Sequence, residues 1–147
     1  MEAGTYNFTL LSSTLLPDQP LAGEGTTPVF IIDWEVAQHG VRAVDIGEML
    51  GDLYALWRYQ NIDGGLCILQ GFVEGYKLES EASAFRTAIQ MGGRLLCHSL
   101  DLPEWGNEEQ KSEIAKLGAE MMTRAYRKDR SWFEAGELAC LFTGIKV

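Results

Sequence analysis

The stretch from Val29 to Leu50 constrains this chain most, because it joins an apolar run, an acidic residue and the start of a helical pattern. The four apolar residues Val29-Phe30-Ile31-Ile32 are typical of a short buried strand. Asp33 follows directly, and a carboxylate at the end of a buried strand is costly unless it is paired, hydrogen-bonded or metal-bound. The pattern predicts either a turn-capping aspartate or a site for a hard cation such as Mg²⁺, which binds carboxylate and phosphate oxygens.

The order Ile31-Ile32-Asp33-Trp34-Glu35, then Gly40, then Asp45-Ile46-Gly47 resembles the metal-binding segment of the aminoglycoside phosphotransferase and choline kinase-like family. These small-molecule kinases share the protein-kinase fold. The resemblance implies that Asp33 holds Mg²⁺ beside ATP, as the Asp of D-F-G does in protein kinases. It also implies that Asp45 braces the catalytic segment without touching substrate. The helical remainder resembles the substrate-side C-terminal lobe of fungal-type members.

Two further residues accompany this segment. Glu35 would orient the metal, bind an outer-shell water or pair with an arginine. Asn7 lies upstream of the apolar run, about where the family carries its metal-binding Asn, and is a second candidate metal ligand. A metal held by Asp33 and Glu35 for hydrolysis is a weaker alternative, because the pattern lacks the histidine ligands that such sites use.

A phosphoryl-transfer enzyme must cradle the nucleotide, position the acceptor hydroxyl and neutralise charge with a metal. The family does this with an N-terminal lobe and a His-x-Asp catalytic loop, and the chain contains no His-x-Asp sequence. The segment Gly23–Pro28 lacks the third glycine and the following helix of a phosphate loop, so we expect a linker. The resemblance therefore implies a phosphotransferase fragment, inactive alone and without a catalytic residue. The alternative is a non-enzymatic helical interaction module derived from that family, able to dimerise through exposed apolar surface.

The expected fold is mainly α with a small N-terminal β hairpin, and it resembles the C-terminal part of a protein-kinase-like large lobe. Residues Tyr6–Leu11 are rich in β-prone side chains and would pair with Val29–Ile32 across a proline- and glycine-rich loop. Residues 1–35 would hold the hairpin and the metal-binding segment. Residues 45–141 would form a helical subdomain within a single partial domain, 1–147.

The helical part is predicted from capping residues and from apolar spacing. Asp45 with Glu48 and Asn107 with Gln110 fit capping boxes, and Asp63 would cap a helix between them. Four apolar stripes follow helical periodicity: Ile46, Met49, Leu50, Leu53, Tyr54 and Trp57; Leu66, Leu69, Phe72, Val73 and Tyr76; Phe85, Ala88, Ile89, Gly92, Leu95 and Leu96; Ile114, Leu117, Met121 and Ala125.

Within the third stripe, Gly92-Gly93 is predicted to mark a close approach of two helices.

A basic cluster made of Arg124, Arg127, Lys128 and Arg130 stands near the end of the fourth helix, where cations suit the helix dipole. Phosphate binding is the alternative role for this cluster. A last short helix is expected to begin at Ser131.

The composition disfavours several classes of partner. A net charge of −9 argues against nucleic acid or an anionic membrane surface. No apolar run approaches the roughly 18–20 residues that span a bilayer, and Met1–Gly4 lacks the pattern of a secretory signal. Cys67, Cys97 and Cys140 are far apart and are expected to be buried thiols in a reducing compartment. We therefore expect a cytoplasmic protein. The family resemblance, and not the composition, implies Mg²⁺ and ATP as cofactors and a small-molecule substrate for the complete enzyme.

Overall fold

The computed structural model describes residues 9–12, 29–32, 40–101 and 107–145. Two short strands come first, β1 (Thr9–Ser12) and β2 (Val29–Ile32). The helices that follow are α1 (Arg42–Gln60), α2 (Gly64–Tyr76), α3 (Glu81–Asp101), α4 (Glu108–Tyr126), the short α5 (Arg130–Glu134) and the 3-10 helix η4 (Glu137–Phe142).

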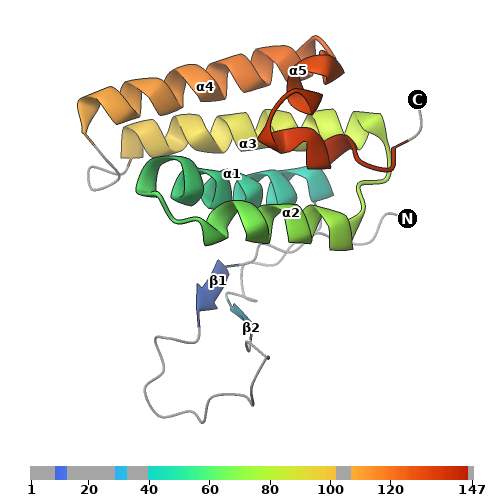
Figure 1. Ribbon diagram of the computed structural model, residues 1–147, viewed down its shortest axis with the longest axis horizontal. Helices are drawn as coiled ribbons and strands as arrows, with labels where there is room; N and C mark the ends of the chain where they lie inside the picture. Colours follow the sequence, from blue (N-terminus) through green and yellow to red (C-terminus); the bar gives the residue numbers. More distant parts are fainter. Residues whose placement is uncertain (1–8, 13–28, 33–39, 102–106, 146–147) are drawn as a thin grey trace.

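The expected fold class, a helical domain with an N-terminal β hairpin, is wrong for the body that the structure describes. Residues 40–101 and 107–145 consist of helices and their connections and contain no strand. β1 and β2 pair antiparallel, with Thr9 opposite Ile32, but each is only four residues long. A two-stranded pair of this size is marginal on its own, and the chain between the strands lies outside the described residues. The pair therefore stands apart from the helical body of residues 40–101 and 107–145, below which Figure 1 shows the two strands.

The four long helices stack in the order α4, α3, α1, α2 (Figure 1). α3 is the central helix, because it packs against α4 on one side and α1 on the other. η4 folds back against α2 and α3 and closes one end of the stack.

The four apolar stripes predicted from the sequence supply most of this core. Leu50, Leu69, Leu95 and Met121, one from each long helix, are completely buried. Partly buried members such as Met49, Phe72 and Leu117 pack against the core from its edge. Tyr76, at the end of the second stripe, is instead exposed.

The predicted close helix approach is confirmed at Gly92 but not at Gly93. A Cβ added at Gly92 would lie 2.7 Å from the carbonyl oxygen of Gly118, and one added at Gly118 would lie 2.6 Å from that of Gly92. α3 and α4 therefore touch backbone to backbone at this pair, which only glycine allows. A Cβ at Gly93 would meet nothing within 4 Å, so this second glycine faces away from the contact.

The C-terminal elements are attached to α3 by an aromatic cluster. The rings of Phe85 and Phe142 lie 4.9 Å apart between centroids, and those of Phe133 and Phe142 lie 5.5 Å apart. Phe133 and Phe142 are each only 1% exposed, so α5 and η4 belong to the same core as the long helices.

The predicted burial of the cysteines is wrong for two of the three. Cys67 and Cys97 are exposed, because they lie on the outer faces of α2 and α3, whereas Cys140 is half-buried; all three are free thiols. Among the helices that the structure describes, none is both long enough and apolar enough to cross a membrane.

Candidate functional site

Three of the four predicted site residues, Asn7, Asp33 and Glu35, lie outside the described residues. Asp33 comes directly after the end of β2, and α1 begins at Arg42. The fourth residue, Asp45, lies in the first part of α1 and is the member of the set whose surroundings the structure describes.

Asp45 does not cap α1 as the sequence predicts. The helix begins at Arg42 with Val41 as its N-cap, and no side chain makes a capping hydrogen bond there. Arg42, Ala43 and Val44 extend the helix one turn further back, and the Val44 N–H donates to the Val41 carbonyl oxygen at 2.9 Å. The proposed capping box with Glu48 is therefore wrong. The Asp45 carboxylate still lies in the first turn, where a negative charge suits the helix dipole.

The Asp45 carboxylate occupies an unfavourable environment. Its Oδ2 atom is buried and accepts no hydrogen bond within the part of the chain that the structure describes. Burial, and then the charge of Glu48, raise the pKa of Asp45 above 3.8. An unpartnered buried oxygen of this kind is uncommon in folded proteins and points to a missing donor.

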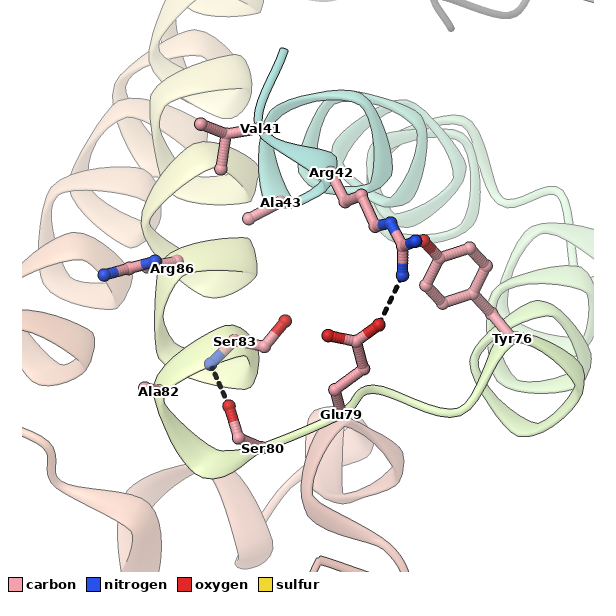
Figure 2. Close-up of a pocket in the computed structure, with 9 residues that line it drawn as sticks. All are labelled: Val41, Arg42, Ala43, Tyr76, Glu79, Ser80, Ala82, Ser83 and Arg86. Carbon is pink, nitrogen blue, oxygen red and sulfur yellow. Dashed lines mark hydrogen bonds and ion pairs between the residues drawn. The ribbon is translucent and has the colours of Figure 1, made fainter. Parts of the chain in front are cut away.

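A small cavity of about 190 Å³ opens beside the start of α1. The elements that surround it are the start of α1, the end of α2, the α2–α3 connection and the first turns of α3 (Figure 2). Its lining residues are Val41, Arg42, Ala43, Tyr76, Glu79, Ser80, Ala82, Ser83 and Arg86. Val41 is the first described lining residue in chain order, and it follows the predicted metal-binding segment in the sequence.

Charged and hydroxyl groups face one another across this cavity (Figure 2). The Arg42 guanidinium group donates a hydrogen bond to the Glu79 carboxylate, and Tyr76 is a further lining residue of the cavity. The Ser80 hydroxyl oxygen accepts a hydrogen bond of 3.2 Å from the Ser83 N–H at the start of α3. Arg86 extends away from the space between these groups.

This arrangement can hold polar groups of a small ligand, because it offers a guanidinium, a carboxylate and hydroxyls within one hollow. Among the lining residues that the structure describes, none is a histidine or cysteine that could act as a general base or nucleophile. In the described part of the chain, no group of three or more His, Cys, Asp and Glu side chains is placed to hold a metal ion.

The alternative role of the basic cluster finds little support. Arg124 donates to Asp129 at 2.8 Å and to Glu120 at 3.1 Å. Arg130 donates to Glu134 at 2.6 Å and lies 3.8 Å from Glu81. Both guanidinium groups thus pair with carboxylates, although Nη1 of Arg130 is buried and makes no hydrogen bond among the described residues.

Sequence reasoning missed the cavity residues Arg42, Glu79 and Ser83. They come from three different elements, and each lies in a locally ordinary helix start or polar turn. Helix packing brings them together, so no local signal could have predicted the hollow.

Comparison with curated proteins shows fungal relatives. The chain is 37% identical over 118 residues to "Phosphotransferase FrzJ" of a Cladobotryum species, covering 80% of this chain and 31% of that protein. It is 26% identical over 107 residues to the "4-hydroxytryptamine kinase" of Psilocybe cyanescens, covering 71% of this chain and 29% of that protein. It is 29% identical over 93 residues to the protein of the same name in Psilocybe cubensis, covering 61% of this chain and 25% of that protein.

The chain is therefore related to kinase-like phosphotransferases. It spans less than a third of the length of these relatives. No protein-family model and no solved structure matches the chain.

Proposed function

We propose that this chain is the metal-binding and helical part of an ATP-dependent small-molecule phosphotransferase of the aminoglycoside phosphotransferase and choline kinase-like family. The complete enzyme would transfer the γ-phosphoryl group of Mg-ATP to a hydroxyl of its substrate. The observation that carries this proposal is the 37% identity to a phosphotransferase over 80% of the chain. The spacing of Asp33, Gly40 and Asp45 supports the same family.

In this proposal the Asp33 carboxylate, with the Asn7 amide oxygen as a second donor, would hold the metal ion. The chemistry of these donors fits the group, because Mg²⁺ prefers oxygen ligands and often takes one or two carboxylates together with substrate phosphates. When bound, Mg²⁺ supplies charge neutralisation at the transferring phosphates. Glu35, two residues after Asp33, would help to position the metal-binding segment.

Asp45 would act as a positioning residue in the complete enzyme. Its buried Oδ2 lacks a donor among the described residues, and a neighbouring catalytic segment would supply one. The pairing would tie the start of α1 to that segment and so fix the chain that leaves the metal site.

The proposal includes little or no turnover by this chain alone, because a metal ligand without a catalytic base does not complete the reaction. ATP turnover with Mg²⁺ should be measured with a series of hydroxylated acceptors. 4-Hydroxytryptamine should be among the first, because two relatives are named as kinases of that compound. We expect no turnover above background. Turnover that Asp33→Ala abolishes would contradict the proposed inactivity and support the metal site, whereas turnover that survives Asp33→Ala would contradict the site itself.

The alternative of a helical interaction module finds no specific support in the described residues. The exposed large apolar side chains are Val41, Ile62, Ile68, Tyr76 and Tyr126. Ile68 and Tyr76 lie on α2, whereas the other three lie at the start of α1, between α1 and α2, and at the end of α4, so the five do not gather on one element.

A further inference from the structure

A second and larger hollow lies between the end of α2 and the end of η4 with the two residues that follow it. It measures about 580 Å³, within the range of about 300–1,000 Å³ that is typical of small-molecule sites. Its apolar wall is formed by Val73 and Leu78 on one side and Leu141 on the other. We call this hollow the α2–η4 groove.

The polar groups of the groove lie around this apolar wall. They are the side chains of Gln70, Glu74, Lys77, Cys140 and Thr143. α2 ends where Lys77 adopts a left-handed backbone conformation, with a φ of 58°, and donates its N–H to the Val73 carbonyl oxygen at 3.0 Å. The connection that starts there separates the groove from the cavity beside α1, because Lys77 and Leu78 line the groove whereas Tyr76 and Glu79 line the cavity.

Glu74 and Lys77 give the groove one charge of each sign. They stand three residues apart, yet no ion pair joins their side chains to each other or to any other residue in the part of the chain that the structure describes. A carboxylate and an ammonium group are therefore both available beside the same apolar wall. A ligand that complements this arrangement carries a cation, an anion and an apolar body.

We propose that the α2–η4 groove binds a small zwitterionic molecule with an apolar side group, of the class of the aromatic and aliphatic amino acids. The ligand ammonium group would pair with Glu74 and the ligand carboxylate with Lys77. The apolar group would lie against Val73, Leu78 and Leu141. This proposal does not depend on the proposed function.

Cys140 provides a reporter inside the groove. Cys140 is a half-buried lining residue of the hollow, whereas Cys67 and Cys97 are exposed on α2 and α3 and are not among the lining residues. Burial raises the pKa of the Cys140 thiol, so this group is neutral at physiological pH and does not compete for the ligand ammonium group. A bound ligand would shield Cys140 from a thiol reagent and leave the other two cysteines unaffected.

The test uses L-phenylalanine, phenethylamine and 3-phenylpropionate, which share the phenyl group and differ in charge. N-ethylmaleimide labelling of each cysteine is followed by mass spectrometry, and affinities are taken from the concentration dependence of the protection. We expect L-phenylalanine to protect Cys140 selectively and to bind best of the three. Glu74→Gln and Lys77→Gln should each lower the affinity for L-phenylalanine by about fivefold, because each removes one partly exposed ion pair.

The charge assignment makes a crossed prediction for the other two probes. Glu74→Gln should weaken the binding of phenethylamine but not that of 3-phenylpropionate. Lys77→Gln should weaken the binding of 3-phenylpropionate but not that of phenethylamine. Glu109→Gln and Lys116→Gln, on α4 and outside the groove, serve as matched controls and should change nothing. Absence of Cys140 protection, equal protection by all three probes, or protection that neither groove variant weakens would overturn the proposal.

Discussion

Among single residues, Asp45 is the described residue that connects the helical body to the proposed site. Its pKa is raised, first by burial and then by Glu48, and its buried Oδ2 lacks a donor among the described residues. A carboxyl group with a raised pKa in the folded state stabilises the fold below its unfolded pKa of 3.8, and this contribution is lost as the pH rises through the folded value. The ionised Asp45 is therefore a liability of this chain at neutral pH.

Asp45→Asn should accordingly stabilise the chain at neutral pH, because it removes the cost of burying the charge. The advantage over the wild type should shrink as the pH falls toward 3.8. Urea denaturation of both proteins between neutral pH and 3.8 measures this difference in the free energy of unfolding. Asp63→Asn is the matched control, since Asp63 is exposed and makes no side-chain capping bond. An Asp45→Asn stability curve that runs parallel to that of the wild type would contradict the buried-charge account.

At the scale of elements, the contact between α3 and α4 depends on one glycine pair. Gly92→Ala would place a Cβ 2.7 Å from both the Gly118 carbonyl oxygen and Met122 Cγ, so the helices must separate. We expect a loss of about 1–3 kcal/mol in the free energy of unfolding, as for an overpacked core. Gly93→Ala is the control on the same helix, because its new methyl group meets nothing within 4 Å. This substitution should raise the free energy of unfolding by up to about 1 kcal/mol. Chemical denaturation that finds the two variants equally stable would refute the close approach.

The start of α4 carries a reciprocal capping box. The Gln110 N–H donates to Asn107 Oδ1 at 2.9 Å, and the Asn107 N–H donates to Gln110 Oε1 at 3.0 Å. Asn107→Ala removes the first bond and should cost about 1 kcal/mol in thermal or chemical unfolding. Asp63→Ala, at the N-cap of α2, loses no side-chain capping bond and should be close to neutral. An equal effect of the two substitutions would contradict the assignment of the cap.

Much of the helical body could be predicted from the sequence, because apolar periodicity and a capping box are local signals. The stripes of α1, α3 and α4, and the start of α4 at Asn107, follow from them. The start of α1 could not be predicted from Asp45, because a good capping residue can also lie inside a helix whose preceding residues accept helical geometry. The exposure of Cys67 and Cys97 was missed since residue type sets only an average burial.

At the scale of the whole molecule, the site is less predictable than the fold. The cavity beside α1 joins Arg42, Glu79 and Ser83 only because α1, α2 and α3 pack together. The predicted metal-binding segment rests on a resemblance to a family, and the fungal relatives support only the coarser relationship to kinase-like phosphotransferases. The specific ligand set at Asn7, Asp33 and Glu35 stays a prediction, because these residues lie outside the described part.

Calorimetry of ATP binding with and without Mg²⁺ tests most directly the proposal that the carboxylate after β2 binds a metal–nucleotide complex. We expect Mg²⁺-dependent binding that Asp33→Ala abolishes and that Asp63→Ala, which removes an exposed carboxylate elsewhere, leaves unchanged. Binding that does not need Mg²⁺, or that Asp33→Ala and Asp63→Ala affect alike, would contradict the account.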